Sequence, residues 1–332
     1  MTLNHVDRTM TNIKLLRKED IFTQDPKPWH SNYLSMYSSV LGGVVKDPLL
    51  MTIPIDDHMV HRGDGVFEVI KCKEGKIYQL DNHLERLKKS AASIFLALPK
   101  CWKDIKIIIN QTIRYGEERN CLIRLFISRG PGGFTIDPLE CPESQLYVVT
   151  TKIPSYAEKT KKGVSIITSS VPIKPSYFAN IKSCNYLPNV LMKREAIAAS
   201  VDYSIALDER GFLAEGSTES IGIVSKDLIL KFPKFDRVLR GITLSRVYDL
   251  AYDLVRKGTL NEVLFCDIKK EEAYDSREII LLGTTFDILP VIQFDGHKIG
   301  NGTPGKVYKG LRTLLDKDLR CNDQLLTPVW DD

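Results

Sequence analysis

The sequence contains no apolar run of the length that a membrane-spanning helix needs, which is about 20 residues. Its first 20 residues have no hydrophobic segment and carry three acidic residues, Asp7, Glu19 and Asp20. Secretory signals need an apolar segment, and transit peptides are poor in acidic residues. The sequence therefore argues against a secretory signal and, less strongly, against an organellar transit peptide. We expect a cytoplasmic protein that does not contact a membrane.

Clusters of cysteine, histidine or basic residues are missing as well. The seven cysteines are scattered and form no CxxC pair, which predicts free thiols rather than disulfides or a zinc site. Of the six histidines only His58 and His61 lie close together, so no metal site is expected. The net charge is +4 and the tightest basic cluster, residues 159–162, is short. Nucleic acid is therefore not an expected partner.

A chain of 332 residues, with 27% charged and 43% hydrophobic residues, is typical of a globular protein of about two domains. Residues 1–35 mix polar and aromatic side chains and predict an extension over the body. Regular patterns begin at Met36, and the charged stretch 152–162, which contains a proline, is the candidate linker. We expect a smaller domain over 36–152 and a larger one over 153–332. Both mix strands and helices, which indicates an α+β fold.

Apolar spacing and turn residues locate the elements within these halves. Residues 66–80 predict a hairpin, and Asp81 is expected to cap the helix that follows it. Further helices are predicted over 102–115 and 186–199, and Asn185 is expected to cap the second of them. Strands are expected at 122–128, 146–151, 164–169, 203–207, 212–214, 221–224, 228–231, 263–266 and 279–282.

Lys182 has surroundings that point to chemistry. It lies in a small polar loop between Pro175 and Pro188, just before a predicted helix. A lysine amine held at a helix start and away from bulk water has a lowered pKa. More of such an amine is neutral, as a lysine requires in order to attack a carbonyl and form a Schiff base. Most lysines are solvated surface charges, so Lys182 needs support from other motifs.

Three further motifs supply that support. Glu215 ends a predicted strand, where an inward-facing carboxylate can keep a ring nitrogen protonated. Gly241-Ile242-Thr243 opens a helix, whose free N–H groups and dipole suit a phosphate. Gly283-Thr284-Thr285 is a second turn rich in donors, and Arg86 adds a cation on a predicted helix. Each motif alone has an ordinary structural explanation, but a lysine, a carboxylate and a phosphate site together are what pyridoxal 5'-phosphate requires.

In this order the motifs resemble the class IV, or fold-type IV, aminotransferases, from Met36 to Ile299. The matching stretches are 63–68, 83–87, 181–183, 214–217, 241–243, 282–285 and 290–291. Within the class, residues 64–69 and 181–183 look most like D-amino-acid transaminases, the plant-type members in particular. The resemblance implies two α+β domains, the larger a pseudo-barrel, with the cofactor between them. It also implies a homodimer whose sites borrow a loop from the partner.

The resemblance assigns a role to each motif residue. The implied cofactor-binding residues are Arg86, Lys182, Tyr186, Glu215, Ile242, Thr243, Thr284 and Thr285. Lys182 would form the Schiff base with pyridoxal phosphate and move protons. Glu215 would pair with the pyridine nitrogen, and Tyr186 would donate to the phenolic oxygen. The arginine, the threonines and the backbone N–H of Ile242 would hold the phosphate.

The implied function is a ping-pong transamination between a D-amino acid and a 2-oxo acid. The substrate residues depart from the family pattern. Phe67 stands where D-amino-acid transaminases have a tyrosine, and residues 132–135 lack the Arg and His that trap the substrate carboxylate in bacterial members. Arg62 or Arg129 is the expected carboxylate receptor.

Four other functions stay open. Residues 128–133 resemble a loop of aminodeoxychorismate lyases, which share the fold and release pyruvate, although Phe134 replaces the arginine of that family. A branched-chain aminotransferase would have a tyrosine-glycine pattern at residues 63–65. The missing carboxylate trap fits an (R)-selective amine transaminase. A non-catalytic cofactor-binding module would need neither Lys182 nor Glu215.

Overall fold

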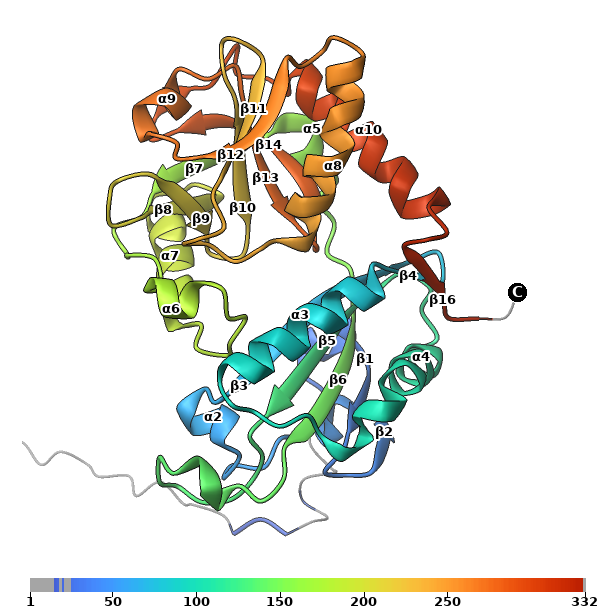
Figure 1. Ribbon diagram of the computed structural model, residues 1–332. Helices are drawn as coiled ribbons and strands as arrows, with labels where there is room; N and C mark the ends of the chain where they lie inside the picture. Colours follow the sequence, from blue (N-terminus) through green and yellow to red (C-terminus); the bar gives the residue numbers. More distant parts are fainter. Residues whose placement is uncertain (1–14, 18–19, 21–24, 331–332) are drawn as a thin grey trace, which may run out of the picture.

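The computed structural model describes residues 15–17, 20 and 25–330. Two sheets, each with its own helices, make up the molecule (Figure 1). Three neighbouring pairs of the described strands are parallel and the others are antiparallel, so the predicted α+β class with two domains is confirmed. Much of the extension predicted over 1–35 lies outside the described residues. No helix in the described part of the chain is long and apolar enough to cross a membrane.

The first sheet has the strand order β16-β4-β3-β5-β6-β1-β2, and its neighbouring strands are antiparallel. These strands are β1 (Tyr33–Ser38), β2 (Gly43–Val45), β3 (Gly65–Lys73), β4 (Lys76–Tyr78), β5 (Cys121–Ser128), β6 (Gln145–Lys152) and β16 (Leu326–Pro328). Helices α3 (Leu80–Ser93) and α4 (Ile105–Gly116) cover one face, because residues such as Leu87 and Ile109 recur on their buried sides. Side chains on the other face look towards the second domain.

The second sheet has the order β12-β11-β10-β13-β14-β7-β8-β9. Its strands are β7 (Val164–Thr168), β8 (Tyr203–Leu207), β9 (Leu213–Gly216), β10 (Ser220–Val224), β11 (Ile229–Pro233), β12 (Glu262–Cys266), β13 (Glu278–Gly283) and β14 (Asp287–Phe294), with β15 (His297–Lys298) beside β14. Strand β9 also pairs with β10, between Glu215 and Ser220, so the sheet closes into a ring. Its helices are α5 (Ala157–Lys162), α6 (Ser176–Ala179), α7 (Leu187–Ala198), α8 (Ile242–Arg256), α9 (Lys270–Tyr274) and α10 (Lys306–Cys321). Helices α8 and α10 share a core with the sheet.

Two predicted helix caps are wrong. The residue that flanks α7 is Tyr186, not Asn185, and no side chain caps this end. The Asn185 side chain instead donates to the carbonyl of Arg62, at 3.3 Å. Asp81 lies inside the first turn of α3, where it is not the cap. Both errors have the same cause. The residues just before these helices are held by residues that are distant in sequence, and a local capping pattern does not show such contacts.

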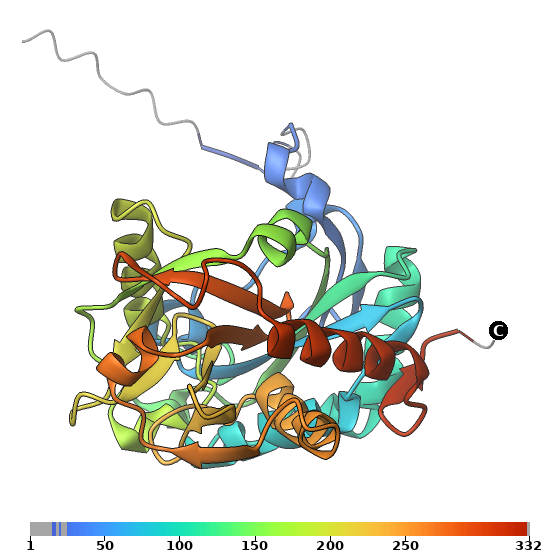
Figure 2. The ribbon, with the colours of Figure 1, turned by 90° about the horizontal axis from the view of Figure 1, so that it is seen from above.

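The C-terminal part of the chain crosses the predicted domain boundary. Helix α10 runs along the second domain, after which β16 pairs with β4 of the first sheet (Figures 1 and 2). The hydroxyl of Tyr78 on β4 also donates to Asp318 of α10. The segment 153–332 therefore supplies one strand to the smaller domain. The predicted linker is short as well, because α5 occupies residues 157–162.

Candidate active site

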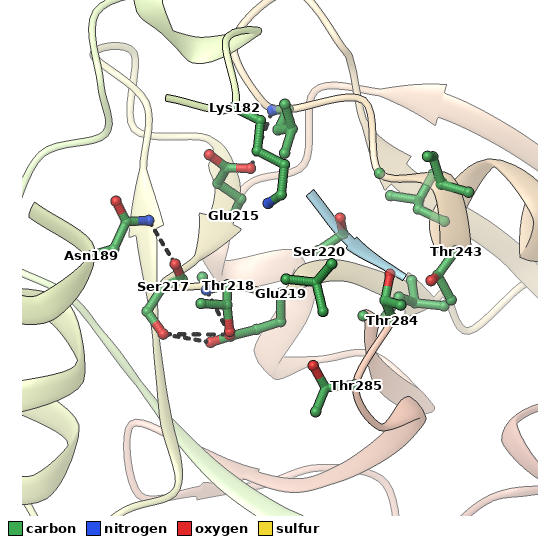
Figure 3. A pocket seen from close by; sticks show the side chains of 18 of the residues that line it. Lys182, Asn189, Glu215, Ser217, Thr218, Glu219, Ser220, Thr243, Thr284 and Thr285 are labelled. Atoms are coloured by element: carbon green, nitrogen blue, oxygen red, sulfur yellow. Dashed lines mark hydrogen bonds between the residues drawn. The ribbon is translucent and has the colours of Figure 1, made fainter. Parts of the chain in front are cut away.

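A cavity of about 450 Å³ lies between the two sheets. Its walls come from β3, β5, α3, the loop before α7, β9, the start of α8 and the β13–β14 turn. Every residue predicted to bind the cofactor lines this cavity, and so does Phe67. Figure 3 shows Lys182 and Glu215 near one another, and Thr243 and Thr284 across the cavity from them. Motifs spread over 200 residues of sequence thus meet in one place.

The loop that carries Lys182 is bonded to strand β3 of the first sheet. The N–H of Phe67 donates to the carbonyl of Lys182 (2.9 Å), and the N–H of Cys184 donates to the carbonyl of Gly65 (2.8 Å). The N–H of Lys182 also donates to Ser90 Oγ on α3, at 3.2 Å. These bonds fix the backbone of a loop that belongs to the second half of the chain. The lysine is therefore held where the two domains meet.

The Lys182 amine lies in an apolar and aromatic corner. Its Nζ is 3.3 Å from the hydroxyl of Tyr186 and 4.6 Å from the centre of the Phe67 ring. Burial, and next the Arg86 charge, lower the pKa of Lys182 to about 8. Burial raises the pKa of Tyr186, so its hydroxyl stays protonated. The pair thus combines an amine that is partly neutral near pH 7 with a protonated hydroxyl 3.3 Å away.

Glu215 faces the cavity from β9. Burial raises the pKa of its carboxyl to about 7, although the N–H of Leu239 donates to Oε2 at 3.2 Å and the charge of Lys182 acts in the opposite direction. A buried carboxylate with so few partners is a strong acceptor for a positively charged N–H group. This is the chemistry that a protonated ring nitrogen requires.

Arg86 is oriented by a buried carboxylate. Its Nε and Nη2 donate to the two oxygens of Glu68, at 2.5 and 2.8 Å, and its Nη1 donates to the carbonyl of Arg240 (2.9 Å). His83 Nδ1 lies 2.7 Å from the same carboxylate. Burial acts to raise the pKa of Glu68, but the Arg86 charge and the hydrogen bonds from Arg86 and His83 outweigh it and lower this pKa to about 2. Burial lowers the pKa of His83 itself, so Arg86 is the partner that stays charged. Glu68 is therefore ionised and holds the guanidinium at the cavity wall.

Beside Arg86, the start of α8 and the β13–β14 turn supply neutral donors. Gly241 flanks α8 without a side-chain cap, which leaves the N–H groups of Ile242 and Thr243 directed at the cavity. A Cβ at Gly241 would lie 2.8 Å from Ser220 Oγ, so a larger residue here would push this hydroxyl aside. Within the described residues, the hydroxyls of Thr243, Thr284 and Thr285 have no hydrogen-bond partner. Free N–H groups at a helix start, free hydroxyls and an arginine are partners for a phosphate.

The sequence analysis missed two cations that line the cavity. Arg124 comes from β5, opposite Val69 of β3, and burial lowers its pKa. The Lys174 amine lies 4.6 Å from the centre of the Tyr186 ring, and burial lowers its pKa too. Neither side chain has a hydrogen bond or ion pair within the described part of the chain. The sequence offers one sign of Arg124, an isolated arginine within the otherwise apolar run 122–127, but it does not show which face the arginine occupies.

The two arginines predicted to bind the substrate carboxylate lie outside this cavity. The Arg129 guanidinium donates to both oxygens of Asp64 (2.9 and 3.1 Å) and to the carbonyls of Ile94 and Phe95. Arg62 is exposed and donates to the carbonyl of Phe134, at 2.5 Å. Both side chains stabilise loops of the first domain.

The family model described as Amino-transferase class IV matches residues 65–294. The chain belongs to the class IV aminotransferases. The D-amino-acid transaminase of Arabidopsis thaliana, named as chloroplastic, is 41% identical over 291 residues, covering 87% of this chain and 77% of that one. A putative branched-chain-amino-acid aminotransferase of Methanocaldococcus jannaschii is 32% identical and covers 84% and 95%. The D-alanine aminotransferase of Bacillus licheniformis is 29% identical and covers 80% and 92%.

Among solved structures, the T.th. branched-chain amino acid aminotransferase is similar to this aminotransferase. Its complex with N-(5'-phosphopyridoxyl)-L-glutamate matches with a TM-score of 0.82 at 27% identity, covering 90% of this chain and 99% of that one. The same enzyme with pyridoxamine 5'-phosphate has a TM-score of 0.83. Class IV aminotransferases use pyridoxal phosphate, and this chain is a pyridoxal-phosphate-dependent aminotransferase. Its cytoplasmic location stays a prediction.

The cavity of this aminotransferase fits that cofactor by its own chemistry. Free N–H groups and unpartnered hydroxyls beside Arg86 match a phosphate, and Glu215 matches a protonated pyridine nitrogen. The amine of Lys182 lies in the same cavity with a lowered pKa. The individual roles of these residues stay predictions, which the experiments below test.

Proposed function

We propose that this enzyme is a D-amino-acid transaminase, which moves the amino group of a D-amino acid to a 2-oxo acid by a ping-pong cycle. The proposal depends above all on the position of the Lys182 amine, 3.3 Å from the Tyr186 hydroxyl and in one cavity with Glu215 and the phosphate-binding groups. The preference for D-amino acids is supported by the 41% identity with the Arabidopsis D-amino-acid transaminase. The identity with the putative branched-chain enzyme is 32%.

Arg86, with the two threonine-bearing segments, would hold the phosphate. An arginine has five N–H donors, and three of those on Arg86 are used by Glu68 and the Arg240 carbonyl. Two donors therefore remain for a phosphate. Because Glu68 fixes the guanidinium plane, little conformational entropy is lost when an anion binds.

Lys182 would act as the general acid and base. When bound, pyridoxal phosphate supplies an aldehyde that takes up the amino group and a ring that withdraws electrons. Glu215 would keep the ring nitrogen protonated, which maintains this withdrawal. The Lys182 Nζ would take the α-proton of the substrate and deliver it to the cofactor carbon that takes up the amino group, and it would reverse both transfers in the other half-reaction. A pKa of about 8 suits this work, because proton transfer is most effective when the pKa is near the working pH.

Arg124 would bind the substrate carboxylate, in place of Arg62 or Arg129. It is a cation of the first sheet that lines the cavity, and within the described residues no carboxylate neutralises it. A charged hydrogen bond contributes about 1.5–3 kcal/mol, so Arg124→Gln should raise the KM for D-alanine about 10- to 100-fold. Cofactor affinity should not change, and Arg62→Gln should behave as the wild type. An unchanged KM in Arg124→Gln would remove the residue from the substrate site.

The enzyme would work as a homodimer. Exposed apolar side chains gather on α6, on α7 and on the loop that follows β5: Tyr177, Phe178, Leu187, Val190, Phe134, Ile136 and Leu139. Helix α2 (His58–Arg62) joins these segments, because Arg62 contacts both Asn185 and Phe134. Such a patch beside a cavity favours a second copy as its cover. Val190→Glu should halve the mass measured by light scattering, whereas Ile107→Glu on the exposed side of α4 should not.

The deciding experiment follows the absorbance of the cofactor-loaded enzyme after D-alanine is added without an oxo acid. We expect the near-visible band to bleach as an equivalent of pyruvate forms. Lys182→Ala should show neither change, while Lys193→Ala, which alters an exposed lysine of α7, should behave as the wild type. Bleaching by L-leucine and not by D-alanine would make the enzyme a branched-chain aminotransferase instead. Pyruvate release from aminodeoxychorismate alone would make it a lyase.

A further inference from the structure

A buried ion pair joins the two domains next to the phosphate-binding segments. Lys71, on β3 of the first sheet, contacts Asp287, the first residue of β14 in the second sheet, with Nζ 2.5 Å from Oδ1. Lys71 is 6% exposed and Asp287 is 8% exposed. The other Asp287 oxygen lies 3.7 Å from Nη2 of Arg312 on α10. The carboxylate is thus held from both domains.

Asp287 closes the turn that carries Thr284 and Thr285. Strand β13 ends at Gly283, which is the register partner of Asp287, so the loop between them has three residues. Asp287 has a left-handed backbone conformation, with φ of +69°. Hairpins with three-residue loops commonly have such a residue at this place, and glycine suits it best. From this position the Asp287 carboxylate meets Lys71.

The side chain of Lys71 belongs to the same face of β3 as two cavity residues. Phe67, Val69 and Lys71 alternate along the strand, and the first two line the cavity. A buried ion pair contributes little net stability, because removing both charges from water offsets their attraction. Such a pair sets the position of one surface relative to the other, and it adds little to the stability of their contact. Here the segment held in place is the turn that carries Thr284 and Thr285, whose hydroxyls face no partner among the described residues.

We propose that Lys71 is a positioning residue, which places the Thr284–Thr285 turn for phosphate binding by holding Asp287 from across the domain boundary. This inference rests on the proposed role of the turn as part of the phosphate site. Lys71 itself would not touch the cofactor. Its loss should weaken the binding of a ligand that carries a phosphate and leave the rest of the cavity unchanged.

The test compares the affinity of the apoenzyme for pyridoxal phosphate with its affinity for pyridoxal, which lacks the phosphate. In Lys71→Met the Kd for pyridoxal phosphate should rise about 10- to 100-fold, the range seen when the outer partner of a metal-ligating side chain is lost. The Kd for pyridoxal should stay within a factor of about two. Lys231→Met is the matched control, because it breaks a partly buried lysine–carboxylate pair (2.7 Å to Glu272) that lies away from the cavity.

A second variant separates positioning from simple destabilisation. Lys71→Met/Asp287→Asn removes both charges, so no buried carboxylate is left with the 3.7 Å contact to Arg312 as its ion pair, and asparagine tolerates the left-handed conformation. It should show the same selective loss for pyridoxal phosphate, with a smaller fall in melting temperature than Lys71→Met alone. Equal weakening of both ligands, or a lower melting temperature with unchanged affinities, would overturn the positioning role.

Thr285→Val shows which idea is wrong if the Lys71 variants behave as the wild type: the positioning role of Lys71, or the binding of phosphate by the Thr284–Thr285 turn. If Thr285→Val weakens pyridoxal phosphate selectively and the Lys71 variants do not, the turn binds phosphate without help from Lys71. If neither change affects the ratio of the two affinities, the turn does not bind phosphate and both proposals are wrong.

Discussion

The buried carboxylate of Glu68 should make the free energy of unfolding of this enzyme depend on pH. Burial alone would raise its pKa, but Arg86 and His83 lower the pKa from an ordinary 4.5 to about 2. Each pH unit of that difference corresponds to about 1.4 kcal/mol, so ionised Glu68 contributes about 3 kcal/mol to the free energy of unfolding. The folded-state pKa is depressed, so this contribution is complete above pH 4.5 and is lost as the pH falls towards 2.

Glu68→Gln should remove this contribution, because glutamine has the shape of the protonated acid and carries no charge. We expect the variant to be about 3 kcal/mol less stable than the wild type at pH 6, with the difference shrinking towards zero between pH 4.5 and 2. Urea unfolding of both apoenzymes at several pH values measures the difference directly. Glu158→Gln, which alters an exposed ion pair on α5, should match the wild type throughout. A difference that is the same at pH 6 and at pH 3 would show that Glu68 stabilises by packing and not by charge.

Three further outcomes are expected. Burial raises the pKa of Glu215 to about 7, so the wild-type apoenzyme loses stability as the pH rises from 4.5 through 7. In urea unfolding Glu215→Gln should therefore be about 3 kcal/mol more stable than the wild type at pH 8; an advantage over the wild type that is no larger at pH 8 than at pH 4 would contradict this. The labelling rate of Lys182 in the apoenzyme by an amine-reactive probe should rise with a midpoint near pH 8, and a midpoint near 10.5 would refute the lowered pKa. Gly222→Ala should lower the free energy of unfolding by about 1–3 kcal/mol, because its Cβ would meet the buried Phe232 ring, and a Tm equal to that of the wild type would show that the ring has room to move.

Much of the candidate site could be predicted from the sequence because its chemistry is local. A glycine before a helix start, a threonine pair after a buried strand and a lysine before a helix are patterns of adjacent residues, and the fold brings them to one cavity. Long-range partners could not be predicted in this way. Asn185 looks like a helix cap, but its side chain bonds to the carbonyl of Arg62, which is 123 residues away.

The choice of an arginine for the substrate carboxylate shows the same limit. Arg62 and Arg129 lie next to motif residues in the sequence, yet their guanidinium groups are used by nearby carbonyls and by Asp64. Arg124 has no neighbouring motif, and only the pairing of β5 with β3 places it at the cavity. Whether a charged side chain is free or already paired depends on tertiary contacts, which no local pattern contains.

The pairing of β16 with β4 has a consequence for how the chain is made. Strand β16 pairs with β4 through Leu326 and Tyr78 and ends at residue 328. The outer edge of β4 therefore has no partner strand until residue 328 has left the ribosome. During that interval the second sheet can form, but the first sheet cannot be completed. An open edge is a template for wrong pairing with other chains. A fragment that contains only the first domain would keep this edge permanently, and we expect it to aggregate where the full chain folds.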